Sequence, residues 1–89
     1  MNVRIESLGE APLIAEYDAE RQTVRVNARM VERMRAHHGE AAASDLIRTA
    51  VAHERFHAEH PGCTEAEAHA FAFAQTQCDP HALELMLRS

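Results

Sequence analysis

The chain has 89 residues, enough for one domain with a thin core, so residues 1–89 are expected to form a single unit. Fourteen acidic residues against nine basic ones give a formal charge of −5, which argues against nucleic-acid binding because phosphate contacts need a basic face. No apolar run approaches the roughly 18 residues of a membrane span. The two cysteines, Cys63 and Cys78, are too few for a disulfide framework and indicate a reducing cytoplasm.

Alternating apolar and polar side chains predict short strands in the first 27 residues. The segments with this alternation are residues 3–5, 13–17 and 23–27. Asp18-Ala19-Glu20-Arg21 separates the last two segments and has the composition of a hairpin turn. We therefore expect a small antiparallel hairpin or meander of two or three strands over residues 1–27.

From residue 28 onward the spacing of apolar residues becomes helical, and four helices are expected. They run from residue 28 to a C-cap at Gly39, from Ala41 to His60, from about Glu65 to Gln77, and from Pro80 to near Arg88. Thr64 followed by Glu67 matches the capping box that begins a helix. We expect Phe71 and Phe73 to pack into the core. The expected fold class is α+β, a small sheet packed on about four helices.

His53-Glu54-Arg55-Phe56-His57 is an H-E-x-x-H motif inside the second predicted helix. Residues four apart share one face of a helix, so His53 and His57 can present their imidazoles to one ion. Glu54 can then reach a water on that ion and act as general base, the role that the motif assigns to it in zinc metallopeptidases. Because the apolar stripe through Leu46 and Ala50 continues the face of the two histidines, the site is expected to open on the buried side of the helix.

A catalytic zinc site usually has three protein ligands and one open position, so one more ligand is needed. The residues that follow the motif and could supply it are His60, Cys63, Glu65, Glu67 and His69. An antiparallel return of the chain after Pro61-Gly62 would bring both glutamates alongside His57, and geometry alone does not choose between them. A fourth protein ligand from Cys63, His60 or His69 would instead close the site, which predicts a zinc-stabilised binding or regulatory module without turnover.

The segment Glu65-Ala66-Glu67-Ala68-His69-Ala70-Phe71-Ala72 resembles the second helix of the gluzincin metallopeptidases. In the small ImmA/IrrE-type peptidases and the minigluzincins, that helix reads approximately E-x-x-A-[DN]-x-F-A. The resemblance covers about residues 12–75 and puts the family's third zinc ligand on Glu65. The family's Asp or Asn, which orients a zinc-bound histidine, is His69 in this chain, so this histidine stands as an orienting residue or a competing ligand.

The resemblance implies a minimal zincin-like domain that hydrolyses peptide bonds with Zn²⁺ bound by His53, His57 and Glu65, and with Glu54 as the base. A peptide or protein substrate is expected to add as a strand to the edge of the hairpin, at Gln22–Asn27. The thin core and the exposed hairpin edge would also suit a homodimer. Because some minigluzincins resemble zymogens blocked by their own C-terminal segment, residues 76–89 are considered as a cover for the cleft.

Overall fold

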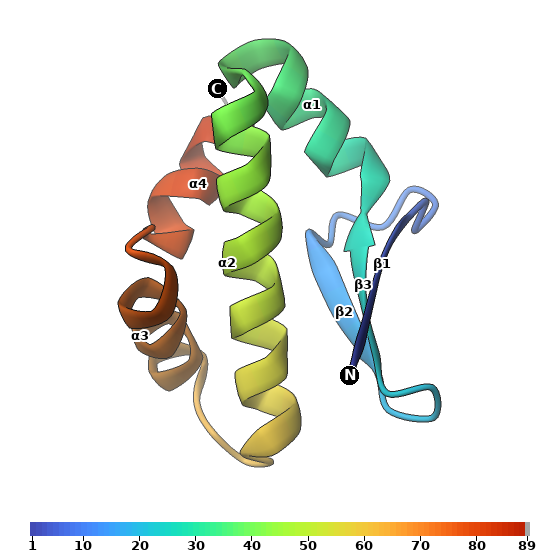
Figure 1. Ribbon diagram of the computed structural model, residues 1–89, viewed down its shortest axis with the longest axis vertical. Coiled ribbons are helices and arrows are strands. Elements are labelled where there is room, and N and C mark those ends of the chain that lie inside the picture. The colour runs from blue at the N-terminus through green and yellow to red at the C-terminus, as the bar shows by residue number, and fades with distance from the viewer. Residues whose placement is uncertain (89) are drawn as a thin grey trace.

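Three strands and then four helices follow one another along the chain (Figure 1). Their bounds are β1 (Asn2–Glu6), β2 (Ala15–Asp18), β3 (Thr23–Asn27), α1 (Ala28–His38), α2 (Glu40–Glu59), α3 (Glu65–Thr76) and α4 (Pro80–Arg88). The structure is a computed structural model that describes residues 1–88, so the last residue of the expected domain and of the segment 76–89 lies outside the described residues. The α+β class is confirmed.

The sheet is mixed, with β3 at its centre and the strand order β1-β3-β2. The predicted hairpin is present, because β2 pairs with β3 in antiparallel fashion. The expectation of a wholly antiparallel meander is wrong, since β1 pairs with β3 in parallel. The long connection between β1 and β2 lets β2 start on the far side of the sheet, and β3 then returns between the two earlier strands. The predicted substrate edge at Gln22–Asn27 is therefore also wrong, because β3 has a partner strand on each side.

Asn27 joins the end of β3 to the start of α1 and is fully buried. Its Oδ1 accepts a hydrogen bond from the backbone N–H of Arg29 at 3.1 Å and so caps α1. Its Nδ2 donates to the carbonyl of Leu13 at 2.9 Å, and its backbone N–H donates to the carbonyl of Ile14 at 2.8 Å. One residue thus fixes the sheet, the first helix and the loop before β2 relative to one another.

Replacing Asn27 by Ala should lower the free energy of unfolding by about 2–3 kcal/mol, because it removes a helix cap and leaves the carbonyl of Leu13 without its donor. Urea unfolding followed by circular dichroism measures the change. Asn2→Ala, at an exposed position on β1, is the matched control and should stay within about 0.5 kcal/mol of wild type. A loss no larger than that of the control would contradict the role assigned to Asn27.

The helices begin and end within about one residue of the predicted positions, and the caps explain why. Gly39 ends α1 with φ at 92°, in the region that favours glycine. Thr64 and Glu67 form the expected capping box at the start of α3. Asp79 accepts from the backbone N–H of His81 in the first turn of α4. Within residues 1–88, no helix is both long and apolar enough to cross a bilayer.

The core lies between the sheet and the helices, and α2 packs against β2 and β3. Its buried residues are Val24, Val26, Val31, Met34, Ala43, Leu46, Leu83 and Leu87. Phe71 and Phe73 are not among them. Their side chains are 37% and 47% exposed, so the prediction that they pack in the core is wrong. The buried residues of α3 are small instead, with Ala68 and Ala72 fully buried and Thr76 nearly so.

Candidate metal centre

His53 and His57 lie in the last two turns of α2, on the face that contacts α3. Their spacing of four residues places one ring edge-on to the other, with centroids 4.7 Å apart. Both side chains are mostly covered, with 17% and 27% exposed. The helical period that the sequence shows is therefore sufficient to bring the two imidazoles together.

Glu65 reaches both imidazoles from the first turn of α3. Pro61 and Gly62 end α2, and the cap at Thr64 starts α3 along the returning direction. The Glu65 carboxylate lies 2.7 Å from Nε2 of His57 through Oε1 and 3.2 Å from Nε2 of His53 through Oε2. Burial alone would raise the pKa of Glu65, but the two imidazoles together outweigh it, and the pKa of this carboxyl lies below its ordinary value.

The Nε2 atom of His57 is shielded from solvent and has no hydrogen-bond partner among the described residues. The carboxylate oxygen of Glu65 that lies 2.7 Å from this nitrogen does not meet hydrogen-bond geometry with it. A buried ring nitrogen without a hydrogen bond is costly unless it binds a ligand. The residues present therefore fit a zinc ion: two imidazole nitrogens and one carboxylate, with one nitrogen left without another partner.

Cys63 contacts His57 from the opposite side of the ring. Its Sγ lies 3.3 Å from Nδ1 of His57. When Nδ1 carries the proton and donates it to Sγ, the lone pair of Nε2 is left for an ion. The thiol thus contacts the ring nitrogen of His57 that does not approach Glu65.

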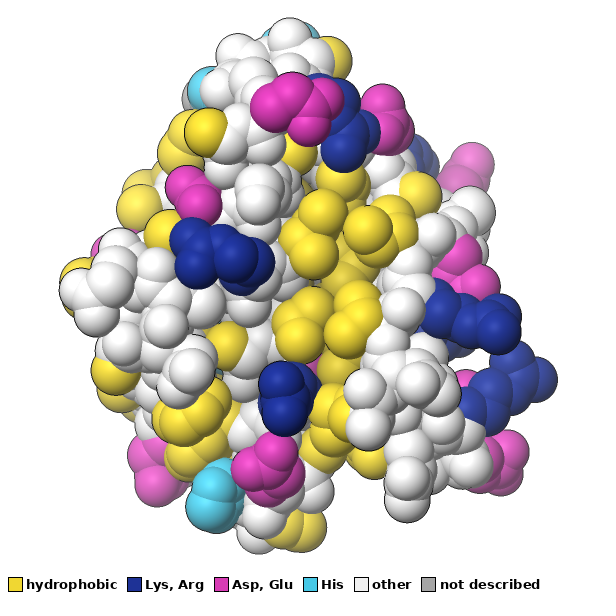
Figure 2. Space-filling view, in the orientation of Figure 1, with side chains coloured by type: hydrophobic (Ala, Val, Ile, Leu, Met, Phe, Trp, Pro, Cys, Tyr) yellow, Lys and Arg dark blue, Asp and Glu magenta, His cyan; other side chains and the backbone are white. Residues whose placement is uncertain are grey.

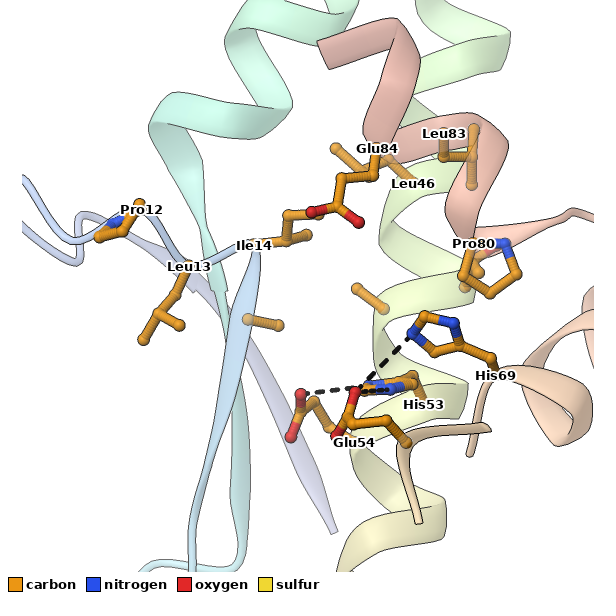
Figure 3. Close-up of a pocket in the computed structure, with 14 residues that line it drawn as sticks. Pro12, Leu13, Ile14, Leu46, His53, Glu54, His69, Pro80, Leu83 and Glu84 are labelled. Atoms are coloured by element: carbon orange, nitrogen blue, oxygen red, sulfur yellow. Dashed lines mark hydrogen bonds and ion pairs between the residues drawn. The ribbon is translucent and has the colours of Figure 1, made fainter. Parts of the chain in front are cut away.

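His69 stands one helical turn after Glu65 on α3 and faces the same centre (Figure 3). Its Nε2 lies 3.7 Å from Oε2 of Glu65, and its ring centroid is 4.9 Å from that of His53. The ligand atoms of His53, Glu65 and His69 all lie within 4.8 Å of one another. This histidine is therefore close enough to compete as a metal ligand, which is one of the two roles that the sequence leaves open for it.

The other two ligand candidates are engaged elsewhere. The Glu67 carboxylate accepts from the backbone N–H of Thr64 at 3.1 Å and from its hydroxyl at 3.0 Å. The backbone hydrogen bond is the main reason why the pKa of Glu67 lies below its ordinary value. The ring of His60 packs on Phe56, with centroids 4.4 Å apart. Neither side chain contributes to the group around Glu65 that the structure assembles.

Glu54 lies beside His53 at one end of a cleft of about 320 Å³ (Figure 3). Its Oε1 is 3.4 Å from Nδ1 of His53, and this hydrogen bond is the largest cause of the raised pKa of His53. The cleft runs along the stripe Leu46, Ala50 and His53, on the side of α2 where the sequence predicts that the site opens. An ionisable cluster at the end of an apolar cleft is a common arrangement in binding and catalytic sites.

The C-terminal helix forms one wall of this cleft. Pro80, Leu83 and Glu84 of α4 line it together with Ile14, the residue just before β2 (Figure 3). Leu83 and Leu87 are also part of the buried core. Deleting residues 76–89 would therefore unfold part of the core, so deletion cannot serve as a simple test of whether this segment covers the site.

In comparisons with known proteins, no family model, no curated protein and no solved structure matched this chain. The resemblance to the gluzincins thus rests on the residues of the two motifs.

Proposed function

We propose that this chain is a zinc metallopeptidase of minimal gluzincin type, with His53, His57 and Glu65 as the metal ligands. The observation that carries the proposal is the position of Glu65. Its carboxylate lies within 3.2 Å of both H-E-x-x-H imidazoles, although it comes from a different helix. A chance match to the motif would not require a carboxylate at this place, whereas a His₂Glu zinc site does.

Each residue of the site has a distinct part in hydrolysis. A bound zinc ion would supply a nucleophilic water at neutral pH and polarise the carbonyl of the scissile bond. Glu54, at the end of the cleft, takes the proton of the attacking water and passes it to the leaving amine. Cys63 holds the His57 ring through Nδ1, and the contact between Glu54 and His53 restrains the other ring.

The cleft favours a peptide or protein substrate. Its walls away from Glu54 are mostly apolar and include Ile14, Leu46 and Leu83, which suits an apolar side chain of the substrate. We also place the protein in a reducing cytoplasm, because Cys63 and Cys78 are both free thiols. The experiment that tests the proposal compares hydrolysis of unfolded casein by zinc-loaded wild type and by the Glu54→Gln variant.

The position of His69 favours a second candidate function, a zinc-stabilised module without turnover. If His69 binds the metal together with His53, His57 and Glu65, four protein ligands close the site, as in structural zinc sites. The exposed fraction of His69, 40%, is larger than that of the two motif histidines. This exposure supports a histidine that orients a ligand from the rim of the site over one that closes it.

His69→Asn distinguishes the two candidates, because Asn occupies this position in the family's pattern. For an orienting residue, we expect zinc affinity to fall by no more than about 10–100-fold, with hydrolysis kept at saturating zinc. The absorption spectrum of the cobalt-substituted protein should keep its band positions. His60→Asn is the matched control, because this ring packs on Phe56, and it should leave both readouts unchanged. Hydrolysis that arises only in His69→Asn would instead establish that His69 closes the site.

A further inference from the structure

The outer edge of β1 has no partner strand within residues 1–88. The strand order leaves β1 at one end of the sheet. The backbone N–H of Asn2 donates to the carbonyl of Gln22 at 3.0 Å, so this residue bonds toward β3. Because backbone groups alternate in direction along a strand, those of Val3 and Ile5 point away from the sheet. This edge is ready to pair with another strand.

Apolar side chains border the same edge. Val3 and Ile5 stand beside Val24 and Val26 in the parallel register, on the face of the sheet that α2 covers. Val24 and Val26 are fully buried, whereas Val3 is 46% and Ile5 is 50% exposed. Helix α2 therefore covers β2 and β3 but leaves the apolar side chains of the edge strand β1 about half exposed.

A groove between β1 and the helices continues this apolar surface. It has a volume of about 570 Å³, and its lining includes Val3, Ile47, Val51, Phe56 and Phe71. The rings of Phe56 and Phe71 stack with centroids 4.8 Å apart. Figure 2 shows hydrophobic side chains gathered in a band along the middle of this face, between α2 and the sheet. The lining also includes Arg48, Arg55 and Glu59, and apolar side chains accompanied by charged ones in this way mark an interaction surface.

We propose that a second copy of this chain covers this face, with the two β1 strands paired in antiparallel fashion about a twofold axis at Ile5. In this register Ile5 of each copy exchanges both backbone hydrogen bonds with Ile5 of the other. Arg4 of each copy then lies opposite Glu6 of the other. These two residues form a non-hydrogen-bonded pair, the type in which the facing side chains are closer together. With the axis perpendicular to the sheet, both α2 helices lie on the same side, and the two apolar grooves meet.

The charges of β1 favour a second copy of this chain as the partner that pairs with its exposed edge. Arg4 has no ion-pair partner within the part of the chain that the structure describes, although it lies in line with Glu6 on the polar face of the sheet. Pairing centred on Ile5 gives two Arg–Glu pairs, whereas pairing centred on Arg4 would set two arginines opposite each other. Arg25 does not depend on Glu6 alone, since Glu16 also binds it, at 2.5 Å. The strand is thus complementary to its own copy in one register.

Sedimentation velocity of the purified full chain, from low micromolar to submillimolar concentration, tests this pairing. Wild type should form a dimer. Arg4→Glu and Glu6→Arg should each weaken the dimer about tenfold or more, because like charges then face each other twice. An equimolar mixture of the two variants should form the dimer again, since both cross-strand pairs become opposite in charge. Repulsion at any other surface would not be relieved by mixing.

Two further variants separate the strand edge from general surface effects. Arg33→Glu makes the same charge change at an exposed position on α1 and should leave the dimer intact. Ile5→Asp should be monomeric, whereas Leu85→Asp, at a 56% exposed position on α4, should stay dimeric. Circular dichroism checks that each variant is folded. A monomeric wild type, or folded Arg4→Glu and Glu6→Arg proteins that stay monomeric when mixed, would overturn the proposal.

Discussion

Replacing Glu54 by Gln should lower kcat/KM for peptide hydrolysis by about 10²–10⁴-fold while zinc stays at one ion per chain. Gln has nearly the shape of Glu but cannot accept the proton of the attacking water. The Glu54 side chain is 18% exposed and lies at the end of the cleft beside His53, so the substitution changes one group inside a site that is otherwise kept. Hydrolysis of casein, followed together with metal content by mass spectrometry, measures both effects.

Glu59→Gln is the control for this experiment, because it makes the same change on the same helix at an exposed position. It should leave hydrolysis and zinc content at wild-type levels. If Glu54→Gln also loses zinc, Glu54 acts through its contact with His53, and the base of the reaction lies elsewhere. If the variant keeps both zinc and hydrolysis, Glu54 is not the base.

Most of the local structure could be predicted from the sequence because it depends on residues close in the chain. The caps at Gly39 and Thr64 and the four-residue spacing of His53 and His57 are of this kind. The strand order could not be predicted, since it depends on how the connection before β2 crosses the sheet and on the buried side chain of Asn27 that holds it. Periodicity likewise placed Phe71 on a helix but did not show that small residues would occupy the inner face of α3.

The candidate site also has features that could be predicted from the sequence and features that could not. The pair His53 and His57 follows from helical spacing alone. Choosing Glu65 over Glu67 needed a resemblance, and the structure adds a physical difference: residues two apart on a helix point to different sides, and Thr64 binds the second carboxylate. The sequence placed Cys63 beside the site, as a residue that supports a ligand or as an alternative ligand. Its contact with Nδ1 of His57 could not be specified, because it depends on the path of the turn between α2 and α3.

Zinc should stabilise this domain strongly, and His57→Ala should abolish the effect. At free zinc 1,000-fold above the dissociation constant, binding adds about 4 kcal/mol to the free energy of unfolding. For a domain of this length that corresponds to a rise in Tm on the order of 15 °C or more. Differential scanning calorimetry of chelator-treated and zinc-loaded protein measures it. His81→Ala, at an exposed histidine on α4, should keep the full rise.

Uptake of zinc should also release protons, which separates the site from loose surface binding. The hydrogen bond to Glu54 raises the pKa of His53, so the metal-free site binds a proton more readily than a free imidazole does. Zinc must displace that proton, and its apparent affinity should therefore fall as the pH is lowered through this raised pKa. Calorimetric titration in two buffers of different ionisation enthalpy counts the protons. If a folded wild type takes up no zinc, the H-E-x-x-H motif does not bind metal in this chain. The apolar face at β1 would then be the feature of the structure that best indicates a function.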